Sequence, residues 1–374
     1  MGKLISLEKD PNIKISNSLE YFLDPDFIYI PAENIQVHQN EFVYKNMPVC
    51  KNYCSSISGI AYGLKKRLFH NGVKDSLVIA NDFRELENTP TKKRSKVTIK
   101  NILSVLNINN KTLLEKFKSQ NKFDNIVITA INDEPYVYNH IFILKENITD
   151  LLELLDELSL IYKTNHNYLI VKNIDTTIIN DCLNVIGTYP NIELTLVNDE
   201  YLLEREEFIF SKLQINSNTL YLTTQELLEL NNYLLNKDNT TTLLTISGNA
   251  LKENKTIRVK KYTLLKDILT KYFELLTDEY VVIVNGLMQG YSIKDTTNLV
   301  IDDQITAINI MKPFKNPEPQ CINCGQCLEI CPKGVNPLTG KNIAKCINCG
   351  LCTYICPGFV NLKNKIKEYK NDQY

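Results

Sequence analysis

Eight cysteines near the C-terminal end are the residues whose spacing points most directly to chemistry. They lie in CINCGQCLEICPKGVNPLTGKNIAKCINCGLCTYICP (321–357), in a chain of 374 residues that contains eleven cysteines. The stretch holds two copies of C-x2-C-x2-C-x3-C-P, the bacterial iron–sulfur pattern in which the fourth cysteine of one motif reaches the other cluster. The pattern predicts two [4Fe–4S] clusters. They should be close neighbours, because the segment between the motifs is short and polar.

Each predicted cluster takes three cysteines from one motif and the fourth from its twin. Three cysteines at two-residue gaps wrap one tight loop, so their sulfurs converge, whereas the cysteine before proline lies beyond the turn and faces the other motif. Cluster A is assigned to Cys321, Cys324, Cys327 and Cys356, and cluster B to Cys346, Cys349, Cys352 and Cys331. Gly325 and Gly350 lie inside the loops, where the backbone must pass close to cluster sulfur.

Two other uses of these thiols fit the spacing less well. Zinc sites use paired C-x2-C knuckles rather than triplets followed by C-P, and disulfides are rare in a reducing compartment. The other cysteines are expected to be structural: Cys50 and Cys54 form C-x3-C with no third ligand nearby, and Cys182 follows the inner rhythm of a predicted helix. The four histidines are scattered and form no catalytic grouping; they are His38, His70, His140 and His166.

The composition is that of an ordinary globular protein. Apolar residues make up 44% of the chain, so cores can form. The formal net charge is −1, which argues against a general nucleic-acid binder. No apolar run reaches the roughly 18 residues of a membrane span, and the N-terminal MGKLISLEKDPNIKIS lacks the apolar core of a secretory signal. We therefore expect a cytoplasmic location, with a peripheral place on a membrane only through partner proteins.

The rest of the chain must position the cysteines, and its patterns divide it into four units. Short strand-like runs without a clear helix predict a small N-terminal β-domain. Strands and helices then alternate from about 97 to 235, which is typical of an α/β layer with a mostly parallel sheet. Further strands around one short amphipathic helix predict a compact β module before the cysteines. The expected units are residues 1–85, 97–238, 241–312 and 315–374.

Local signals mark a linker and two helix starts. The polar stretch ELENTPTKKRSK (85–96), with its basic run from Lys92 to Lys96, predicts a solvated linker, with a membrane-surface or partner-binding patch as the minor alternative. In the α/β unit, Thr149 is placed as the N-cap of a helix over 148–163. Thr223 with Glu226 three positions on is a capping box, which predicts that a second helix begins there.

The order of these parts resembles the C subunit of the Rnf complex, over most of the chain. YCSSISGIAYG (53–63) is similar to that family's hammerhead domain, a barrel-sandwich fold, and NIVITAINDEPYVYN (125–139) to a strand and acidic loop of its Rossmann-like flavin/NADH domain. The stretches beginning ISGNALKENK (246) and VNGLMQGYSIKD (284) look like its soluble-ligand-binding (SLBB) β-grasp domain. The resemblance implies an α/β multidomain protein ending in a two-cluster ferredoxin-type domain. Rnf complexes couple ferredoxin oxidation to NAD reduction and ion pumping.

The chain departs from this family at the flavin/NADH site. Family members carry a glycine-rich loop before the acidic strand, which lets backbone N–H groups approach phosphate, but no glycine occurs here between Gly72 and Gly187. In the acidic loop, Asn132 replaces a family carboxylate. The resemblance implies that Glu134 and Tyr136 are the remaining candidate cofactor-binding residues of this degenerate loop. Because the glycine-rich loop and one carboxylate are missing, neither FMN nor NADH is expected to bind. The hammerhead-like unit lacks a modifiable lysine, and no biotin or lipoate is expected.

Three functions are compatible with these features. The leading hypothesis is an electron-carrier subunit that relays single electrons through two [4Fe–4S] clusters in an Rnf-like complex. Its partners would be a ferredoxin-like donor and other subunits of that complex. The first alternative is a flavin/NADH-dependent oxidoreductase, such as a cobalamin-reductase-like protein. The second is a non-catalytic, cluster-bearing module for binding or sensing.

Overall fold

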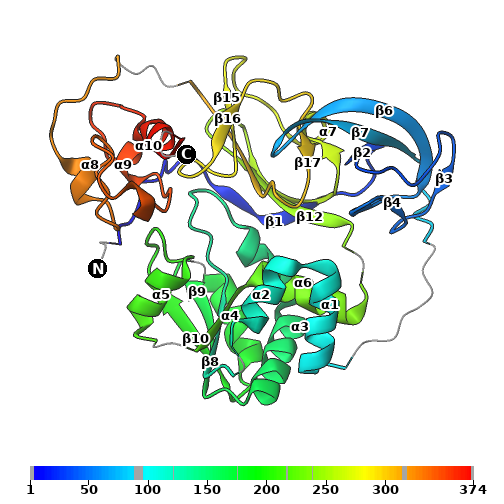
Figure 1. Cartoon of the computed structure of the whole chain (residues 1–374), viewed down its shortest axis with the longest axis horizontal. Coiled ribbons are helices and arrows are strands. Elements are labelled where there is room, and N and C mark those ends of the chain that lie inside the picture. The colour runs from blue at the N-terminus through cyan, green and yellow to red at the C-terminus, as the bar shows by residue number, and fades with distance from the viewer. Residues whose placement is uncertain are drawn as a thin grey trace.

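A computed structural model provides the fold. It describes residues 4–87, 96–120, 122–174, 176–215, 218–237, 239–313 and 318–371. The basic run of the expected linker, apart from Lys96, lies outside these residues. In the described ranges, no helix is long and apolar enough to cross a membrane. Figure 1 shows an α/β unit below a row of β units, with the cysteine-bearing unit at one end of that row.

The N-terminal β unit is built on a four-stranded antiparallel sheet. Its two long central strands pair along their whole length and curve over a core that includes Ile28, Ile57 and Phe69. The strands, in sheet order, are β2 (Phe27–Pro31), β7 (Gly72–Asn81), β6 (Gly59–Phe69) and β3 (Phe42–Val43), with a small pair β4 (Pro48–Cys50) and β5 (Tyr53–Cys54) beside them. Cys50 is buried in this core and Cys54 is exposed.

The first strand of the chain belongs to a different sheet. β1 (Ile15–Phe22) pairs in parallel with β13 (Asn254–Lys260) at the edge of the 241–312 unit. The sequence placed residues 1–85 in one unit, so the structure divides that range. A parallel strand pair between segments more than 200 residues apart leaves no local turn signal, which is why the pattern of residues 15–22 did not indicate its partner.

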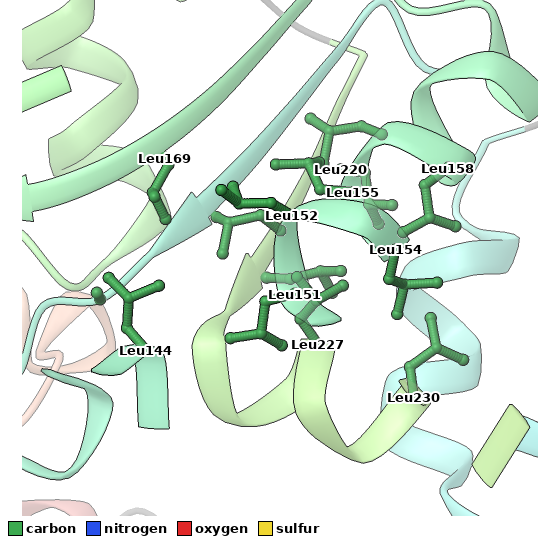
Figure 2. Packing of buried hydrophobic residues seen from close by; sticks show 14 of the residues in the cluster. Leu144, Leu151, Leu152, Leu154, Leu155, Leu158, Leu169, Leu220, Leu227 and Leu230 are labelled. Carbon is green, nitrogen blue, oxygen red and sulfur yellow. The ribbon is translucent and has the colours of Figure 1, made fainter. Parts of the chain in front are cut away.

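The α/β unit has a fully parallel four-stranded sheet, as the strand–helix alternation predicted. The sheet order is β10 (Ile192–Val197), β9 (His166–Lys172), β8 (Asn125–Thr129) and β11 (Thr219–Thr223). Its helices are α1 (Ile99–Asn109), α2 (Lys111–Lys118), α3 (Asn139–Tyr162), α4 (Thr176–Ile186), α5 (Glu206–Leu213) and α6 (Thr224–Leu235). Leucines of α3 and α6 meet leucines of the strands in one continuous core, as Figure 2 shows.

The two expected helix starts have different outcomes. The capping box is confirmed: the Thr223 hydroxyl accepts a hydrogen bond from the Glu226 backbone N–H, and the Glu226 carboxylate accepts one from the Thr223 N–H. The expected N-cap at Thr149 is wrong, because α3 begins at Asn139 and runs through position 149. Its non-helical residue is Asn147, where two helical segments join at a kink. The sequence signal therefore detected the second segment two residues late.

The third unit is a mixed sheet that wraps one helix, α7 (Leu265–Tyr272). β12 (Thr241–Ser247) pairs antiparallel with β13 and in parallel with β18 (Ala307–Met311). In sheet order the strands are β1, β13, β12 (Thr241–Ser247), β18 (Ala307–Met311), β15 (Val281–Val284) and β16 (Tyr291–Ile293), with a short pair β14 (Thr263–Leu264) and β17 (Val300–Ile301) beside the N-terminal unit. Ile257, Ile268 and Ile308 are fully buried in its core.

The cysteine-bearing unit contains little regular structure. Its elements are the single turns α8 (Gln326–Glu329) and α9 (Leu351–Tyr354), the 3-10 turn η1 (Ile343–Lys345) and the terminal helix α10 (Leu362–Asn371). Ile343 of η1 and Ile366 of α10 are buried together with Val335. Figure 1 shows α8, α9 and α10 gathered at one end of the molecule, beside the loop that joins β15 and β16.

Candidate iron–sulfur centre

The eight motif cysteines surround two separate cavities. One is lined by Cys321, Cys324, Cys327 and Cys356, and the other by Cys331, Cys346, Cys349 and Cys352. These are the sets that the spacing assigned to clusters A and B, so we call the cavities A and B. Each takes three cysteines from one motif and the fourth from its twin. The cavities are neighbours, because Cys352 of cavity B packs against the small core that contains Cys327 of cavity A.

The two loops around the cavities have nearly the same backbone conformation. The central asparagines Asn323 and Asn348 have φ values of 55° and 56°, and the glycines Gly325 and Gly350 have 79° and 81°. Asparagine and glycine are the residues that adopt this left-handed region at least cost. Each glycine also precedes a single helical turn, α8 or α9, whose first residues include the third cysteine of the motif. The repeated sequence therefore folds as a repeated structure.

The part of the chain that the structure describes shows no single-ion metal site. Within the described ranges, no group of three or more histidine, cysteine or acidic side chains is close enough to hold one ion. A single zinc ion would need its sulfurs at about 2.3 Å, whereas a cubane of four irons separates the four thiolates that hold it. Burial raises the pKa of the Cys352 thiol to about 12, so this sulfur must release its proton when it binds iron.

Cavity A has more exposed cysteines than cavity B. Cys321 and Cys324 are exposed, and Cys327 is buried. Ile322, between the first two cysteines, has 63% of its surface exposed, and Leu328 and Phe359 are also exposed. All the residues that line the cavity, including Ile322, Leu338 and Leu362, belong to the cysteine-bearing unit.

Cavity B faces the rest of the protein. The backbone carbonyl of Cys349 accepts a hydrogen bond of 2.5 Å from the buried Tyr201 hydroxyl. Arg205, just before α5, donates to the carbonyl of Ile347 at 3.1 Å and to the Gln289 side chain at 2.8 Å. The α/β unit therefore holds the cavity B loop directly, through two side chains that precede α5.

A lysine on α10 closes cavity B on its other side. Lys363 lines the cavity, and its ammonium donates to the backbone carbonyls of Met288 at 3.4 Å and Gly290 at 2.9 Å, and to that of Gln289 between them. Burial, together with the charge of Lys367, lowers the pKa of Lys363. An ammonium has three N–H donors, and this loop supplies three acceptors for them.

Glu134, predicted from the resemblance as a cofactor-binding residue, holds this same loop. Its two carboxylate oxygens accept hydrogen bonds from the backbone N–H groups of Met288 at 2.9 Å and Gln289 at 2.8 Å. A Cβ at Gly286, which has a φ of +99°, would lie 2.2 Å from the Glu134 carboxylate, so the approach requires glycine. Burial raises the pKa of Glu134 to about 7.

Tyr136, the second predicted cofactor-binding residue, is also engaged within the chain. Its hydroxyl accepts a hydrogen bond from the backbone N–H of Asp10, and its carbonyl accepts one from Ser247 at 3.2 Å. Its φ of 61° is unusual for a tyrosine. The N-terminal segment therefore packs across the acidic loop, and its residues Leu4, Ile5 and Leu7 reach the core that contains Met288 and Cys349.

Side chains of the protein itself contact one another near the carboxyl ends of β8 and β11, where the strand order reverses. Ligands of doubly wound sheets bind outside the carboxyl ends of the strands at such a point. Here the His140 ring lies 3.1 Å from the Thr224 hydroxyl and 3.5 Å from a Glu204 carboxylate oxygen, and Asp133 and Glu204 each accept a hydrogen bond from the other's backbone N–H. Burial and the charge of Glu204 raise the pKa of Asp133.

The stretch that corresponds to the missing glycine-rich loop is helical. α1 is capped by the Thr98 hydroxyl, and α2 by the Asn110 side chain that sits between the two helices. Their buried faces, which include Leu106 and Phe117, join the main core of the α/β unit. The sequence indicated the absence of glycine but not these helices.

Three residues near cavity B were missed by sequence reasoning: Tyr201, Arg205 and Lys363. None belongs to a motif, and each reaches the cysteine loops or the 288–290 loop from a distant part of the chain. For Lys363, the sequence showed only a lysine within a lysine-rich segment. Such a pattern by itself indicates a solvated helix face.

A family model matches the C-terminal part of the chain, and a curated relative matches a quarter of it. The family described as "4Fe-4S dicluster domain" matches residues 274–369. A curated relative, the C subunit of the proton-translocating ferredoxin:NAD(+) oxidoreductase complex of Clostridium ljungdahlii, is 35% identical over 98 residues, which are 25% of this chain and 21% of the relative. The chain thus matches about a fifth of that relative's length. The expected resemblance to this kind of protein is confirmed, and the C-terminal unit is a ferredoxin-type iron–sulfur domain.

Solved structures give a more distant likeness. A chain of an NAD+-reducing [NiFe]-hydrogenase in the air-oxidized state has a TM-score of 0.50 at 11% identity, over 76% of this chain and 56% of that one. The same kind of hydrogenase in the H2-reduced state gives a TM-score of 0.42 at 12% identity, over 54% and 47% of the two chains. At such identity, the air-oxidized match supports a shared α/β multidomain fold and nothing more specific.

Proposed function

We propose that this chain is an electron-transfer subunit of an Rnf-like oxidoreductase complex, and that it relays single electrons through two [4Fe–4S] clusters. One observation carries the proposal: two adjacent cavities are each lined by four cysteines, with the fourth exchanged between the motifs. A structural metal site would need one such set. Two neighbouring sets form a path.

The cysteines of cavity A would hold one cluster and those of cavity B the other. When bound, each cluster supplies reversible one-electron chemistry without proton transfer at the thiolates. The protein's own part is to set the potential and exclude water. Backbone N–H groups lie 3.3 Å from the Cys331 sulfur and 3.4 Å from the Cys346 sulfur, donated by Val335 and Asn348. Hydrogen bonds to cluster sulfur stabilise the more negative, reduced state.

We further propose that the α/β unit acts as a scaffold without a nicotinamide or flavin site. Its strand order, with the third, second, first and fourth strands side by side, matches the first four strands of the Rossmann order. However, Glu134 and Tyr136 are engaged by loop and N-terminal backbone groups, and no glycine is available to approach phosphate between Gly72 and Gly187. The third unit is a mixed sheet that wraps one helix, and we propose that it is an SLBB-like β-grasp domain. We propose that the antiparallel N-terminal unit is a hammerhead-like domain.

The alternative of a flavin/NADH-dependent oxidoreductase makes a different prediction in the same sample. The chain would be purified without oxygen, with its clusters intact, and titrated with a reductant while the electron paramagnetic resonance (EPR) signal is followed. We expect about eight iron atoms per chain, reversible reduction of both clusters, no flavin absorbance and no NADH-driven dye reduction. Clusters that stay inert over the accessible potentials would rule out the relay, and NADH-driven turnover would favour the alternative.

The location follows from the partners in this proposal. The chain would lie on the cytoplasmic face of a membrane complex, held by other subunits, with a ferredoxin-like protein as electron donor. No nucleic-acid partner is proposed, because basic and acidic residues nearly balance at 42 to 43.

A further inference from the structure

Positive charge is concentrated in the cysteine-bearing unit. Residues 318–371 contain seven lysines and three glutamates, in a chain whose 42 basic and 43 acidic residues nearly balance as a whole. Lys333 forms an ion pair with Glu207 of α5, and the Lys363 ammonium donates hydrogen bonds to the 288–290 loop. The charge of the remaining lysines can therefore act on what lies outside the protein.

Four of these lysines lie on or just before η1 and on α10, two elements that pack against each other; we call them the η1–α10 face and define it as Lys341, Lys345, Lys367 and Lys370. The ammonium of Lys370 lies 3.2 Å from the carbonyl of Cys346 and 3.2 Å from the Asn348 side chain. The other three are exposed, and within the described ranges they form no ion pair.

Packing keeps this surface together around a cysteine of cavity B. η1 and α10 share the buried residues Ile343 and Ile366. A Cβ at Gly340 would lie 3.3 Å from the ring of Tyr369 on α10, so Lys341 follows the point where the chain passes that helix. Lys345 directly precedes Cys346, which is half-buried. A cavity B sulfur therefore lies at the edge of a cationic surface.

We propose that the η1–α10 face is the docking surface for an acidic one-electron carrier protein that exchanges electrons with the cluster held in cavity B. The inference rests on the proposed relay function and specifies its partner. Charge complementarity selects the occupant: a carrier with a surface rich in carboxylates is attracted to the lysines, and the contact places its redox centre opposite Cys346. In each encounter the carrier loses one electron and the cluster gains it, with no bond or proton exchanged.

Such an encounter has a defined physical signature. Electrostatic attraction raises the association rate of oppositely charged proteins more than it raises their final affinity. Salt screens that attraction, since the Debye length falls from about 30 Å at 0.01 M to about 3 Å at 1 M. Transient redox partners also use small interfaces, and a patch on one short helix and one turn is of that kind.

The test uses the cluster-loaded full chain and an acidic two-[4Fe–4S] ferredoxin, reduced beforehand, in a stopped-flow measurement. The variant is Lys341→Gln, Lys345→Gln and Lys367→Gln together, because these three side chains are exposed and make no described ion pair. The control, Lys111→Gln, Lys118→Gln and Lys122→Gln, changes the net charge equally on exposed positions at α2 and just beyond it. We expect the first variant to slow the second-order rate about tenfold at low salt, with little change at high salt, and the control to match the wild type.

Several outcomes would overturn the proposal. One is equal slowing by both variants, and another is a wild-type rate that does not depend on salt. Binding to anionic phosphatidylserine vesicles that the first variant abolishes, without an effect on electron transfer, would assign the face to a membrane surface instead. A change in cluster potential alone would mean that the lysines only offset the charge of the clusters. The relay itself is tested separately, because it fails only if the wild-type clusters accept no electrons even from dithionite.

Discussion

Cavities A and B come from the same repeated sequence but lie in different surroundings. The loops have nearly equal φ values at Asn323 and Asn348 and at Gly325 and Gly350. The residues that line cavity A all belong to its own unit and include two exposed cysteines, whereas the loop of cavity B is contacted by Tyr201 of the α/β unit and the cavity is lined by Lys363 of α10. The motifs therefore supply the cysteines of both cavities, whereas distant parts of the chain contribute to the surroundings of cavity B.

This difference has an energetic consequence. Cluster potential depends on burial, on hydrogen bonds and on nearby charge, and all three act more strongly at cavity B. Cavity B is also the one whose loop supports contacts between units, through Arg205 and Lys363. Substitutions at cavity B should therefore lower the stability of the whole fold, whereas substitutions at cavity A should affect only the cysteine-bearing unit.

The largest expected effect comes from removing the exchanged cysteines. Cys356 belongs to the second motif but lines cavity A, so Cys356→Ser should eliminate the cluster of cavity A. Cys331 belongs to the first motif but lines cavity B, so Cys331→Ser should eliminate the cluster of cavity B. Each variant should lose about four iron atoms per chain. Iron analysis with EPR spectra of the remaining cluster checks this.

The matched control for both variants is Cys54→Ser, which changes an exposed cysteine in the β unit. It should keep both clusters. If Cys356→Ser spared the cluster of cavity A and depleted that of cavity B, the exchange between motifs would be wrong and each motif would hold its own cluster.

The next effect compares the two loop glycines. Both Gly325→Ala and Gly350→Ala put a side chain in the left-handed region, at a cost of about 1–2 kcal/mol. At Gly325 an added Cβ meets nothing within 4 Å, whereas at Gly350 it would lie 2.3 Å from the carbonyl of Met288. Overpacking adds about 1–3 kcal/mol there. The unfolding midpoint and the iron retained after gel filtration should both fall further for Gly350→Ala; equal losses would contradict the asymmetry.

A smaller effect concerns the potential of the cluster in cavity B. Lys363 places an ammonium beside this cavity, and a nearby positive charge stabilises the reduced cluster. Lys363→Met should therefore lower the midpoint potential of that cluster by on the order of 60 mV, a tenfold change for one electron. EPR-monitored redox titration measures this.

Two further variants isolate the charge. Lys363→Arg keeps the cation and should leave the potential near that of the wild type. Lys365→Met removes an exposed lysine of the same helix and should change neither cluster. A shift of both potentials by Lys363→Met would show that the cation does not distinguish the cavities.

The sequence predicted the parts whose determinants are local. The cysteine sets follow from spacing within 37 residues, and the parallel sheet from strand–helix alternation around runs such as residues 125–129. The capping box was visible because its two partners, Thr223 and Glu226, are three residues apart. In each case the physical contact and the sequence signal span the same short distance.

The parts that could not be predicted depend on long-range contacts. β1 lies against β13, and Lys363 reaches residues 288–290. Glu134 is the clearest case, because the family resemblance suggested a cofactor ligand, whereas in the structure its carboxylate binds backbone N–H groups 154 and 155 residues away. A carboxylate serves either purpose, and its residue type does not indicate which.

The last and smallest effect is the pH dependence that Glu134 contributes. Burial raises its pKa from 4.5 to about 7, so the folded chain binds a proton more tightly than the unfolded chain does. Its contribution to stability is therefore fully present below about pH 4.5 and is lost as the pH rises to about 7, by up to about 3 kcal/mol. Glu134→Gln should remove this dependence, so that the variant gains stability relative to the wild type as the pH rises from 5 to 8.

Urea unfolding followed by circular dichroism at the two pH values measures this difference. Glu115→Gln, on the exposed side of α2, is the control and should follow the wild type at both. Because Glu134 holds the 288–290 loop that lies against Gly350 and Lys363, its ionisation should affect iron retention in cavity B and leave cavity A unchanged. An equal effect on both clusters would mean that the Glu134 contact does not distinguish the cavities, and that the two are more alike than their surroundings indicate.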